Sequence, residues 1–590
     1  MDEKQILAKK EKQMKSFMWF FIALIGMTVY LSFIIAQDKR TEFYLGFVLV
    51  IPFGILSFYF RSKMMKYRAL YYIKDSWGKV NTRKRNLNDI KKLYEFLKSE
   101  NKEVFYIDNQ TFEDFTMDKV FEKLDRTLSG PGEQVLYNML RTPQFNEEEL
   151  SRRKKFINLF QKDKNLRERV QMELYWLSRQ NHNSITDFLW GILPKKSKKS
   201  ILFNTMALLP VIILVLMPFY GLGIGIYIIF VFIINMFIHY KFKKEISMHI
   251  DSITYLSSVI NTARRLGEID NELLADYKTI LKDNVKDIKA AKAAAVIGSV
   301  EGSDPMGAGA ILDYINILFL TKERKFFSVL DEVSKYRDAL RKLYIALGEI
   351  DSFISIASYR EGLDYYTEPE LDNEGKHIEV KDLVHPLIDE PVPNSINIKN
   401  KGIILTGSNM SGKSTFLRTI GVNALFAQTI CTCLAKEYKS SCFKILSSIS
   451  PSDNLLTGKS YYLGEAEAVL RIIKSCEEAI PSLCIIDEIF RGTNPIERIS
   501  ASAEILDFLI SHNSLPIVAT HDLELTEIVD KSYECYYFTE NVGEEGLNFD
   551  YLIRKGVSPT RNAIKLLKYL GYPEEIIYKT YKRVDNLFVK

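Results

Sequence analysis

A run of about forty residues without an aspartate, glutamate, lysine or arginine lies between Lys199 and Lys241. Most of it consists of two apolar stretches, residues 201–219 and 222–239, which the turn PFYGLG joins. Each stretch is long enough for a helix that crosses the roughly 30 Å hydrocarbon layer of a bilayer. Two helices buried in a soluble core are the alternative, but so long an uncharged segment is hard to place inside a soluble domain. The run therefore predicts a transmembrane hairpin over residues 201–240.

A similar pair of apolar stretches lies near the N-terminus, at residues 17–36 and 43–60. The second stretch is shorter and contains Pro52, and a polar turn with Asp38, Lys39, Arg40 and Glu42 connects the two. A cleaved signal peptide is the competing interpretation of the first stretch. No small-residue cleavage site follows it, whereas a second apolar stretch does. We therefore expect a first transmembrane hairpin over residues 16–60, behind an N-terminal tail of residues 1–15, and four membrane spans in all.

Basic residues flank both predicted hairpins. Five lysines precede the first hairpin, RSKMMKYR follows it, and PKKSKK and KFKK lie on either side of the second. Basic flanks stay on the cytoplasmic side of a membrane. This predicts a multi-pass protein of a bacterial plasma membrane with both termini and all large domains in the cytoplasm. The net charge of +5, from 79 basic and 74 acidic residues, does not by itself argue for nucleic-acid binding, because membrane-flanking lysines also produce it.

The rest of the chain changes texture near residue 375. Residues 61–119, 120–200 and 241–374 are charged and have apolar residues at helical spacing, which predicts a helical linker and two helical segments. From residue 375 to 555, short β-branched runs such as GIILTG, LCIIDE and LPIVATH alternate with helical stretches. Strands that alternate with helices predict an α/β domain with a parallel sheet. We thus expect an all-α region, interrupted by transmembrane helices, in front of an α/β domain.

Residues 407–414, GSNMSGKS, fit the phosphate-binding pattern G-x-x-x-x-G-K-[ST], with a predicted strand before them and a predicted helix after them. Glycines let the backbone N–H groups of such a loop face phosphates at the helix N-terminus. Lys413 is expected to reach the β- and γ-phosphates of ATP, and the Ser414 hydroxyl to bind Mg²⁺. The residues predicted to bind the nucleotide are Gly407, Ser408, Asn409, Met410, Ser411, Gly412, Lys413, Ser414 and Thr415.

Two later segments supply candidate catalytic groups. The apolar run LCII ends in Asp487 and Glu488, and the run LPIVAT ends at His521. An α/β sheet presents its catalytic groups at such strand ends. We expect Asp487 to hold Mg²⁺, Glu488 to position the attacking water and His521 to sense the γ-phosphate. Helix-capping carboxylates and a structural histidine are the alternatives, but a phosphate-binding loop requires an acidic partner.

All six cysteines follow residue 430, without the paired spacing of a zinc site or of a secreted disulfide framework. We expect them to be reduced cytosolic thiols. The pair Cys431 and Cys433 as a metal or redox site is the alternative.

With these motifs the chain resembles the MutS family of ATPases. The segments TGSNMSGKSTFLRTIG, DEIFRGT and ATHDLELTEI are similar to the three nucleotide motifs of that family, and VHPLIDEPVPNSI to the segment that precedes them. Residues 453–473 resemble the family's signature segment, and residues from 556 onward its C-terminal dimerisation element. LDRTLSGPGEQVLYNMLRTP and LYIALGEIDSFISIASY resemble the start and end of its helical core. The resemblance covers about residues 120–200 and 330–590.

The resemblance implies a fold and a mode of action. Residues 120–200 and 241–374 would form the helical core and lever, residues 375–555 a P-loop ATPase domain of the ABC/MutS type, and residues 556–590 the dimerisation element. The protein would act as a homodimer through the ATPase domain and the tail, with ATP and Mg²⁺ as cofactors. Ser460 would contact the nucleotide bound by the other subunit. Nothing before residue 120 resembles the family's mismatch-reading domain, and nothing resembles the endonuclease appendage of another branch.

These features favour a membrane-anchored, ATP-hydrolysing MutS-family dimer, with DNA as one candidate target in a repair-like or recombination-related role. An ATP-switched membrane scaffold for protein partners is the main alternative. A transporter is the third hypothesis. Asn204, Asn235 and His239 are the few polar residues within the spans that could serve a transport pathway. A transporter would need a Gly-Gly-Gln type of signature, which GKSYYLGEAE lacks.

Overall fold

The computed structural model describes residues 3–37, 46, 48–178, 184–192, 199–286, 308–408, 410–449, 461–490, 494–529, 531–543, 546–558, 567 and 571–588. The chain forms two compact units, each assembled from separate segments. The first comprises Met1–Thr82, Arg126–Glu133 and Asn158–Gly362, and the second comprises Arg83–Asp125, Gln134–Ile157 and Leu363–Lys590.

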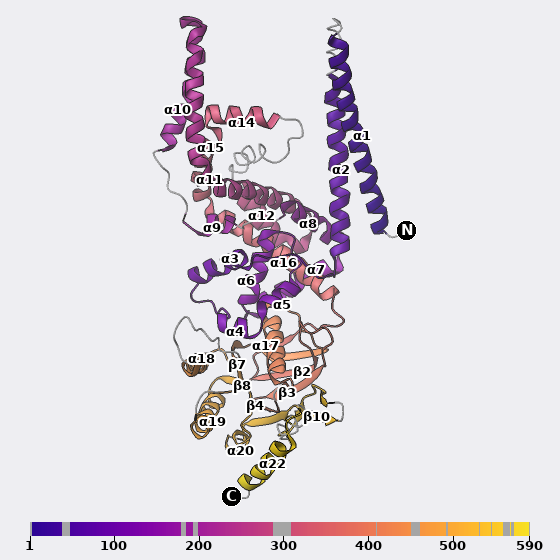
Figure 1. Cartoon of the computed structure of the whole chain (residues 1–590), viewed down its shortest axis with the longest axis vertical. Coiled ribbons are helices and arrows are strands. Elements are labelled where there is room, and N and C mark those ends of the chain that lie inside the picture. Colours follow the sequence, from indigo (N-terminus) through magenta and orange to yellow (C-terminus); the bar gives the residue numbers. More distant parts are fainter. Residues whose placement is uncertain are drawn as a thin grey trace. The chain divides into compact units, whose positions relative to one another are not determined.

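Helices make up the described chain before residue 362, as predicted (Figure 1). They are α1 (Glu3–Gln37), α2 (Val50–Ser76), α3 (Leu87–Glu100), α4 (Asn109–Asp114), α5 (Met117–Leu124), α6 (Gly130–Arg141), α7 (Glu147–Lys162), α8 (Lys164–Leu177), α9 (Ser184–Trp190), α10 (Lys199–Tyr220), α11 (Ile226–Gly267), α12 (Ala275–Lys286), α14 (Ala308–Phe319), α15 (Thr321–Lys335) and α16 (Arg337–Glu361), with 3-10 turns at Leu222–Gly225 and Glu272–Leu274.

Helix α16 is the central helix of the first unit, and its residues from Leu343 to Arg360 are almost all buried. Its Asp351 carboxylate accepts hydrogen bonds from the backbone N–H groups of Leu128 and Ser129. A Cβ atom at Gly132 would lie 2.2 Å from an Asp351 carboxylate oxygen, so only glycine fits there. Charge-assisted bonds to backbone N–H groups are among the stronger hydrogen bonds in proteins. They fix the turn that begins α6 onto α16.

Three of the described helices contain a segment that is long and apolar enough to cross a membrane: Glu3–Ile34, Ile201–Tyr220 and Leu222–Phe242. They overlap three of the four predicted spans, the first of which was expected to extend to residue 36. The remaining one, residues 43–60, begins outside the described residues and continues in α2, which is not among the three. Helices α1 and α2 nevertheless pack against each other as the predicted hairpin requires, with the rings of Phe17 and Phe60 5.1 Å apart. The four membrane spans stay a prediction, which three helices of suitable length and composition support.

The second unit contains the predicted parallel sheet. Its strand order is β12-β9-β4-β8-β7-β6, in which the five strands from β9 to β6 are parallel and β12 is antiparallel to β9. The strands are β4 (Gly402–Thr406), β6 (Lys444–Ser448), β7 (Ser482–Asp487), β8 (Ser514–Ala519), β9 (Tyr533–Tyr537) and β12 (Arg554–Lys555). The helices that follow the first strands are α17 (Lys413–Thr429), α18 (Tyr461–Ser475), α19 (Pro495–Ser511), α20 (Leu525–Ile528) and α22 (Glu574–Phe588).

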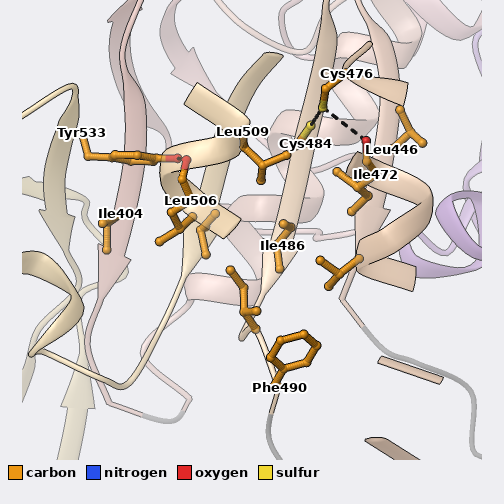
Figure 2. Close-up of a cluster of buried hydrophobic side chains, with 13 residues drawn as sticks. Ile404, Leu446, Ile472, Cys476, Cys484, Ile486, Phe490, Leu506, Leu509 and Tyr533 are labelled. Atoms are coloured by element: carbon orange, nitrogen blue, oxygen red, sulfur yellow. Dashed lines mark hydrogen bonds between the residues drawn. The ribbon is translucent and has the colours of Figure 1, made fainter. Parts of the chain in front are cut away.

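Side chains on both faces of this sheet are buried. Ile404, Cys484, Ile486 and Val518 point into a cluster with residues of α18 and α19, shown in Figure 2. The alternate residues of β7 point to the opposite face, and α17 contacts β7 and β8. A parallel sheet covered on both faces accounts for the nearly continuous apolar strands of the sequence.

Two smaller sheets complete the second unit. One has the order β1-β5-β2-β3 and the other pairs β10 with β11. Their strands are β1 (Glu370–Asp372), β2 (His377–Leu383), β3 (Asn394–Lys399), β5 (Glu437–Ser441), β10 (Glu540–Gly543) and β11 (Gly546–Phe549).

The cysteines lie in packed surroundings, and five of the six are buried. Cys431 and Cys433 direct their thiols to different backbone carbonyls, those of Leu150 and Asn423. The sulfur atoms of Cys476 and Cys484 lie 3.7 Å apart within the apolar cluster of Figure 2. No cluster of three or more histidine, cysteine or acidic side chains suited to a metal occurs among the described residues.

Candidate functional site

The glycine-rich loop connects β4 to α17, as the sequence predicts. Gly407 and Gly412 have φ angles of 140° and 110°, which side-chain-bearing residues rarely adopt. A Cβ atom at Gly407 would also lie 2.7 Å from the carbonyl oxygen of Phe538. These glycines therefore allow the tight curl of the loop in front of the N-terminus of α17. Asn409 lies outside the described residues.

Lys413 is the first residue of α17, and its side chain is folded back over the loop. Its Nζ donates hydrogen bonds to the carbonyl oxygens of Gly407 and Ser408, each at 2.8 Å. It also lies 3.5 Å from His521 Nε2. Only 5% of the lysine is exposed, so its charge is held close to the loop. Phosphate oxygens, which are negatively charged, would be stronger acceptors for this ammonium than neutral carbonyls.

Ser414 and Asp487 meet at the end of the sheet. The Ser414 hydroxyl donates a 2.5 Å hydrogen bond to Asp487 Oδ2. Asp487 is the last residue of β7, whereas Ser414 lies in the first turn of α17. A hydroxyl and a carboxylate are ligands suited to Mg²⁺, which takes oxygen donors and keeps several waters beside one or two protein carboxylates. The two side chains thus fit a magnesium ion bound through few protein ligands.

Glu488 and His521 form a second pair beside the lysine. Glu488 Oε1 lies 3.2 Å from His521 Nε2. The φ angle of Glu488 is 63°, which is uncommon for a residue with a side chain, and its N–H donates to the carbonyl of Ala519. Strand β8, which precedes His521, lies between β4 and β7 in the sheet. Adjacent strand ends therefore bring the histidine, the lysine and the acidic pair together.

These groups surround one open cavity of about 450 Å³. It is lined by Met410, Gly412, Lys413, Ser414, Thr415, Arg418, Ile449, Asp487, Glu488 and His521. The buried Ser411 hydroxyl, in the same loop, has no hydrogen-bond partner among the described residues. A bound phosphate would supply acceptors for such loop groups, so the loop fits the phosphates that the sequence predicts. The hydrogen bonds from Lys413 to the carbonyl oxygens of Gly407 and Ser408 hold its ammonium group at the same loop, which agrees with a phosphate site.

A neighbouring cavity of about 420 Å³ shares Met410, Gly412 and Thr415 with the first. Its other walls come from Leu383, from the part of the VHPLIDEPVPNSI segment between residues 384 and 394, and from Phe416, Thr419, Phe538 and Tyr551. Asn394 accepts a hydrogen bond from the N–H of Ile553 and donates one to the carbonyl of Tyr551, which fixes this wall. Sequence analysis did not single out Phe538 or Tyr551, because neither belongs to a motif and both are distant in sequence.

His385 is a buried residue in the wall of this neighbouring cavity. Burial, with the nearby cations of Arg418 and Lys123, lowers the pKa of His385 to about 4. The imidazole is therefore neutral at physiological pH. Its Nδ1 accepts a hydrogen bond from the N–H of Leu387, which places the proton on Nε2. A neutral, donating ring is compatible with an uncharged ligand group.

Arg418 is a further cavity residue that sequence analysis did not identify. It lies on α17 and its Nε donates to the carbonyl oxygen of Asp114 at 2.7 Å. The Asp114 carboxylate in turn accepts hydrogen bonds from the Ser447 hydroxyl and the N–H of Ile449. Ile449 itself lines the cavity. One wall of the cavity is thus connected to α4 by a chain of hydrogen bonds.

Some predicted site elements lie outside the described residues. They include Ser460 and the first part of the signature segment, up to the start of α18 at Tyr461. Among the residues that line the two cavities, none comes from α18.

Comparison with known proteins places residues 403–588 in the family model MutS domain V. The chain is 33% identical over 273 residues to the DNA mismatch repair protein MutS of Thermotoga petrophila, which is 45% of this chain and 34% of the relative. It is 28% identical over 262 residues to the protein of the same name from Thermus thermophilus, or 43% of this chain and 31% of the relative. The matched region spans about a third of the length of these relatives.

Proposed function

We propose that this chain, whose C-terminal part belongs to the MutS family, binds and hydrolyses ATP with Mg²⁺ while attached to a membrane, and that it does so as a dimer with shared sites. The observation that carries the proposal is the convergence of three groups on one cavity: Lys413, the Ser414–Asp487 pair and the Glu488–His521 pair. Nucleotide hydrolysis needs a cation that binds the phosphates, a pair of side chains that bind magnesium, and a general base.

Each group has a distinct role in the proposed reaction. Lys413 exchanges its loop carbonyl partners for the β- and γ-phosphate oxygens and neutralises part of their charge. Ser414 and Asp487 hold Mg²⁺, which supplies further charge neutralisation at the phosphates. Glu488 orients the attacking water and accepts its proton. His521, 3.2 Å from Glu488 and 3.5 Å from Lys413, couples the base to the phosphate end of the cavity.

The neighbouring cavity is the proposed site for the adenosine part of ATP. It continues from the phosphate-binding loop through shared residues and has apolar walls that include Phe416, Phe538 and Ile388. Aromatic and aliphatic walls with a few polar groups are typical of small-ligand sites. The neutral His385 ring adds an uncharged donor to this wall.

Replacing Lys413 with alanine is expected to weaken ATP binding by roughly a hundredfold, because a buried charge-assisted contact to phosphate is lost. Binding is measured with a fluorescent ATP analogue on the full chain in lipid nanodiscs. Lys474→Ala, an exposed lysine at the end of α18, is the matched control and should bind ATP normally. Unchanged affinity in Lys413→Ala would remove the loop from the proposed site.

For the membrane, we propose four spans with both termini in the cytoplasm, as the basic flanks predict. A reporter enzyme that is active only outside the cytoplasm should be active when fused after Asp38 or near Gly221. The same reporter should be inactive when fused at Lys79 or at Lys590. Activity at Lys590 would contradict an even number of spans, whereas inactivity after Asp38 would contradict the first hairpin.

DNA is the proposed target of the ATP-driven dimer, on the strength of the relatives' name, DNA mismatch repair protein. The match to those relatives covers only about a third of their length, so the name alone carries this part of the proposal. An ATP-switched scaffold for protein partners is the second candidate. Binding of duplex DNA that falls steeply with salt, in nanodiscs of neutral lipid, separates DNA contact from the scaffold.

A further inference from the structure

The second apolar hairpin, formed by α10 and α11, includes three polar side chains that contact the segment around the start of α15. Asn204 Oδ1 accepts a hydrogen bond from Arg324 Nε at 2.8 Å. Asn235 Nδ2 donates to the carbonyl oxygen of Leu318 at 2.7 Å, and His239 Nδ1 lies 2.7 Å from Glu323 Oε1. We call Asn204, Asn235 and His239, with their partners Arg324, Leu318 and Glu323, the clasp.

The clasp sets the position of the α14–α15 segment along α11. The ring of Tyr314, on α14, lies 6.0 Å from that of Phe232, which is the middle residue of the apolar window Leu222–Phe242. The next contacts follow the same direction along both segments: Asn235 of α11 contacts Leu318, and His239 of α11 contacts Glu323. His239 lies seven residues after Phe232, which corresponds to a rise of about 10 Å along the helix. Residues 314–323 therefore follow the half of the window that ends at Phe242.

Helix α14, with the sequence AGAILDYINILF, is largely apolar, with Asp313 and Asn316 as its polar residues, and it packs beside α10 and α11 (Figure 1). Tyr314 and Ile315 are 61% and 45% exposed. Twelve residues make a helix of about 18 Å, which is too short to cross a bilayer. A helix of this length with exposed, large apolar side chains cannot be a membrane span. It therefore requires an apolar environment that does not depend on crossing the bilayer.

The break between α14 and α15 also has the features that an apolar environment requires. Leu320, at the break, has a left-handed φ of 45° and is fully buried. In hydrocarbon, an interruption of a helix is tolerated only where other protein groups satisfy the freed backbone. The fully buried Asn235 supplies that bond to Leu318, and Glu323 is paired with His239, as ionisable groups at membrane depth usually are.

We infer that α14 lies in the hydrocarbon layer, beside α11, as a helix that enters the bilayer without crossing it, and that the clasp holds it there. Its exposed face contacts lipid acyl chains. The inference rests on the proposed membrane attachment of the α10–α11 hairpin. It gives this hairpin a second role, because α15 leads directly into the buried helix α16 and so ties the core of the first unit to the membrane. It also assigns to the clasp the polar side chains that a transport pathway would need.

The test uses a photo-crosslinking residue, p-benzoylphenylalanine, in the full chain in native membranes, with mass spectrometry to identify the adducts. It replaces Ile315 on α14, Ile229 on the exposed side of α11, or Ile280 on the exposed side of α12. Lipid adducts are expected at positions 229 and 315 and not at 280. Adducts at 229 without adducts at 315 would overturn the inference and leave membrane attachment intact, whereas their absence at both positions would overturn the proposed attachment itself.

The clasp has its own test. Cysteines introduced by Phe232→Cys and Tyr314→Cys should be joined efficiently by a short bifunctional thiol reagent. Adding Asn235→Leu, which keeps the number and branching of the side-chain heavy atoms but removes the donor to Leu318, should lower that yield severalfold. The control Ile233→Leu, at an exposed position of the same helix, should leave it unchanged. A yield that Asn235→Leu does not alter would contradict the clasp, even if position 315 contacts lipid.

Discussion

Replacing Glu488 with glutamine should leave ATP bound to the protein and lower its turnover by at least about a hundredfold, the usual scale for loss of a general base. The amide cannot accept a proton from water, but it is nearly the same size as the carboxylate. The magnesium pair, Ser414 and Asp487, is untouched by the change, as is Lys413. Binding and hydrolysis should therefore separate in this variant, unlike in Lys413→Ala, where binding itself is lost.

Single-turnover hydrolysis of radiolabelled ATP, with binding measured in parallel, checks this prediction. Glu504→Gln removes an exposed carboxylate from α19 and should hydrolyse ATP at the normal rate. Normal turnover in Glu488→Gln would mean that another group activates the water. His521 is then the first alternative, because its Nε2 is 3.2 Å from the Glu488 carboxylate.

Sequence analysis identified much of the candidate site because its residues stand at strand ends, where local pattern and chemistry coincide. Apolar runs predicted β4, β7 and β8, and the polar residues that follow them are those that the sheet brings together. The order of strands could not be read in the same way. That β8 lies between β4 and β7, and so delivers His521 to Lys413, depends on the pairing of β8 with β4, which lies more than a hundred residues earlier in the chain, as well as with β7.

Other features depend on long-range contacts that leave no local pattern. In the sequence Arg418 is an ordinary charged residue of a predicted helix, and only the structure places it beside Asp114. Residues 83–125 and 134–157 belong to the same compact unit as the α/β domain, partly through contacts such as Arg153 with the carbonyl of Thr429. In the same way, the partners of Asn235 and His239 lie more than eighty residues further along the chain. No periodicity reports such pairings.

Completion of each site by the other subunit is the second large effect that we expect. Ser460 immediately precedes α18, a helix that packs through Val469 and Ile472 onto the apolar cluster of Figure 2. No described residue of α18 lines either cavity. The family resemblance assigns Ser460 to the nucleotide of the partner, and a helix N-terminus is suited to contact with anions. We therefore expect the loop of one chain and the signature segment of the other to form one site.

Mixing two inactive variants tests this arrangement. Ser460→Arg damages the signature segment and Lys413→Ala damages the loop, so each variant alone should be inactive. A mixed dimer keeps one intact loop, from the Ser460→Arg chain, and one intact signature, from the Lys413→Ala chain. If sites are shared, these two meet and up to about half of the wild-type activity should return, because one of the two sites is whole. Purification through two different tags isolates the mixed dimer for the measurement.

A lack of recovered activity in that dimer would leave two explanations, and a second dimer separates them. Pairing a wild-type chain with a chain that carries both substitutions places each intact element opposite a damaged one. If each site is completed within one chain, the wild-type chain keeps a whole site and about half of the activity remains. If sites are shared, both sites contain one damaged element and activity should be nearly absent. Recovery in the first dimer together with loss in the second is the expected pair of results, because only elements contributed in trans produce both.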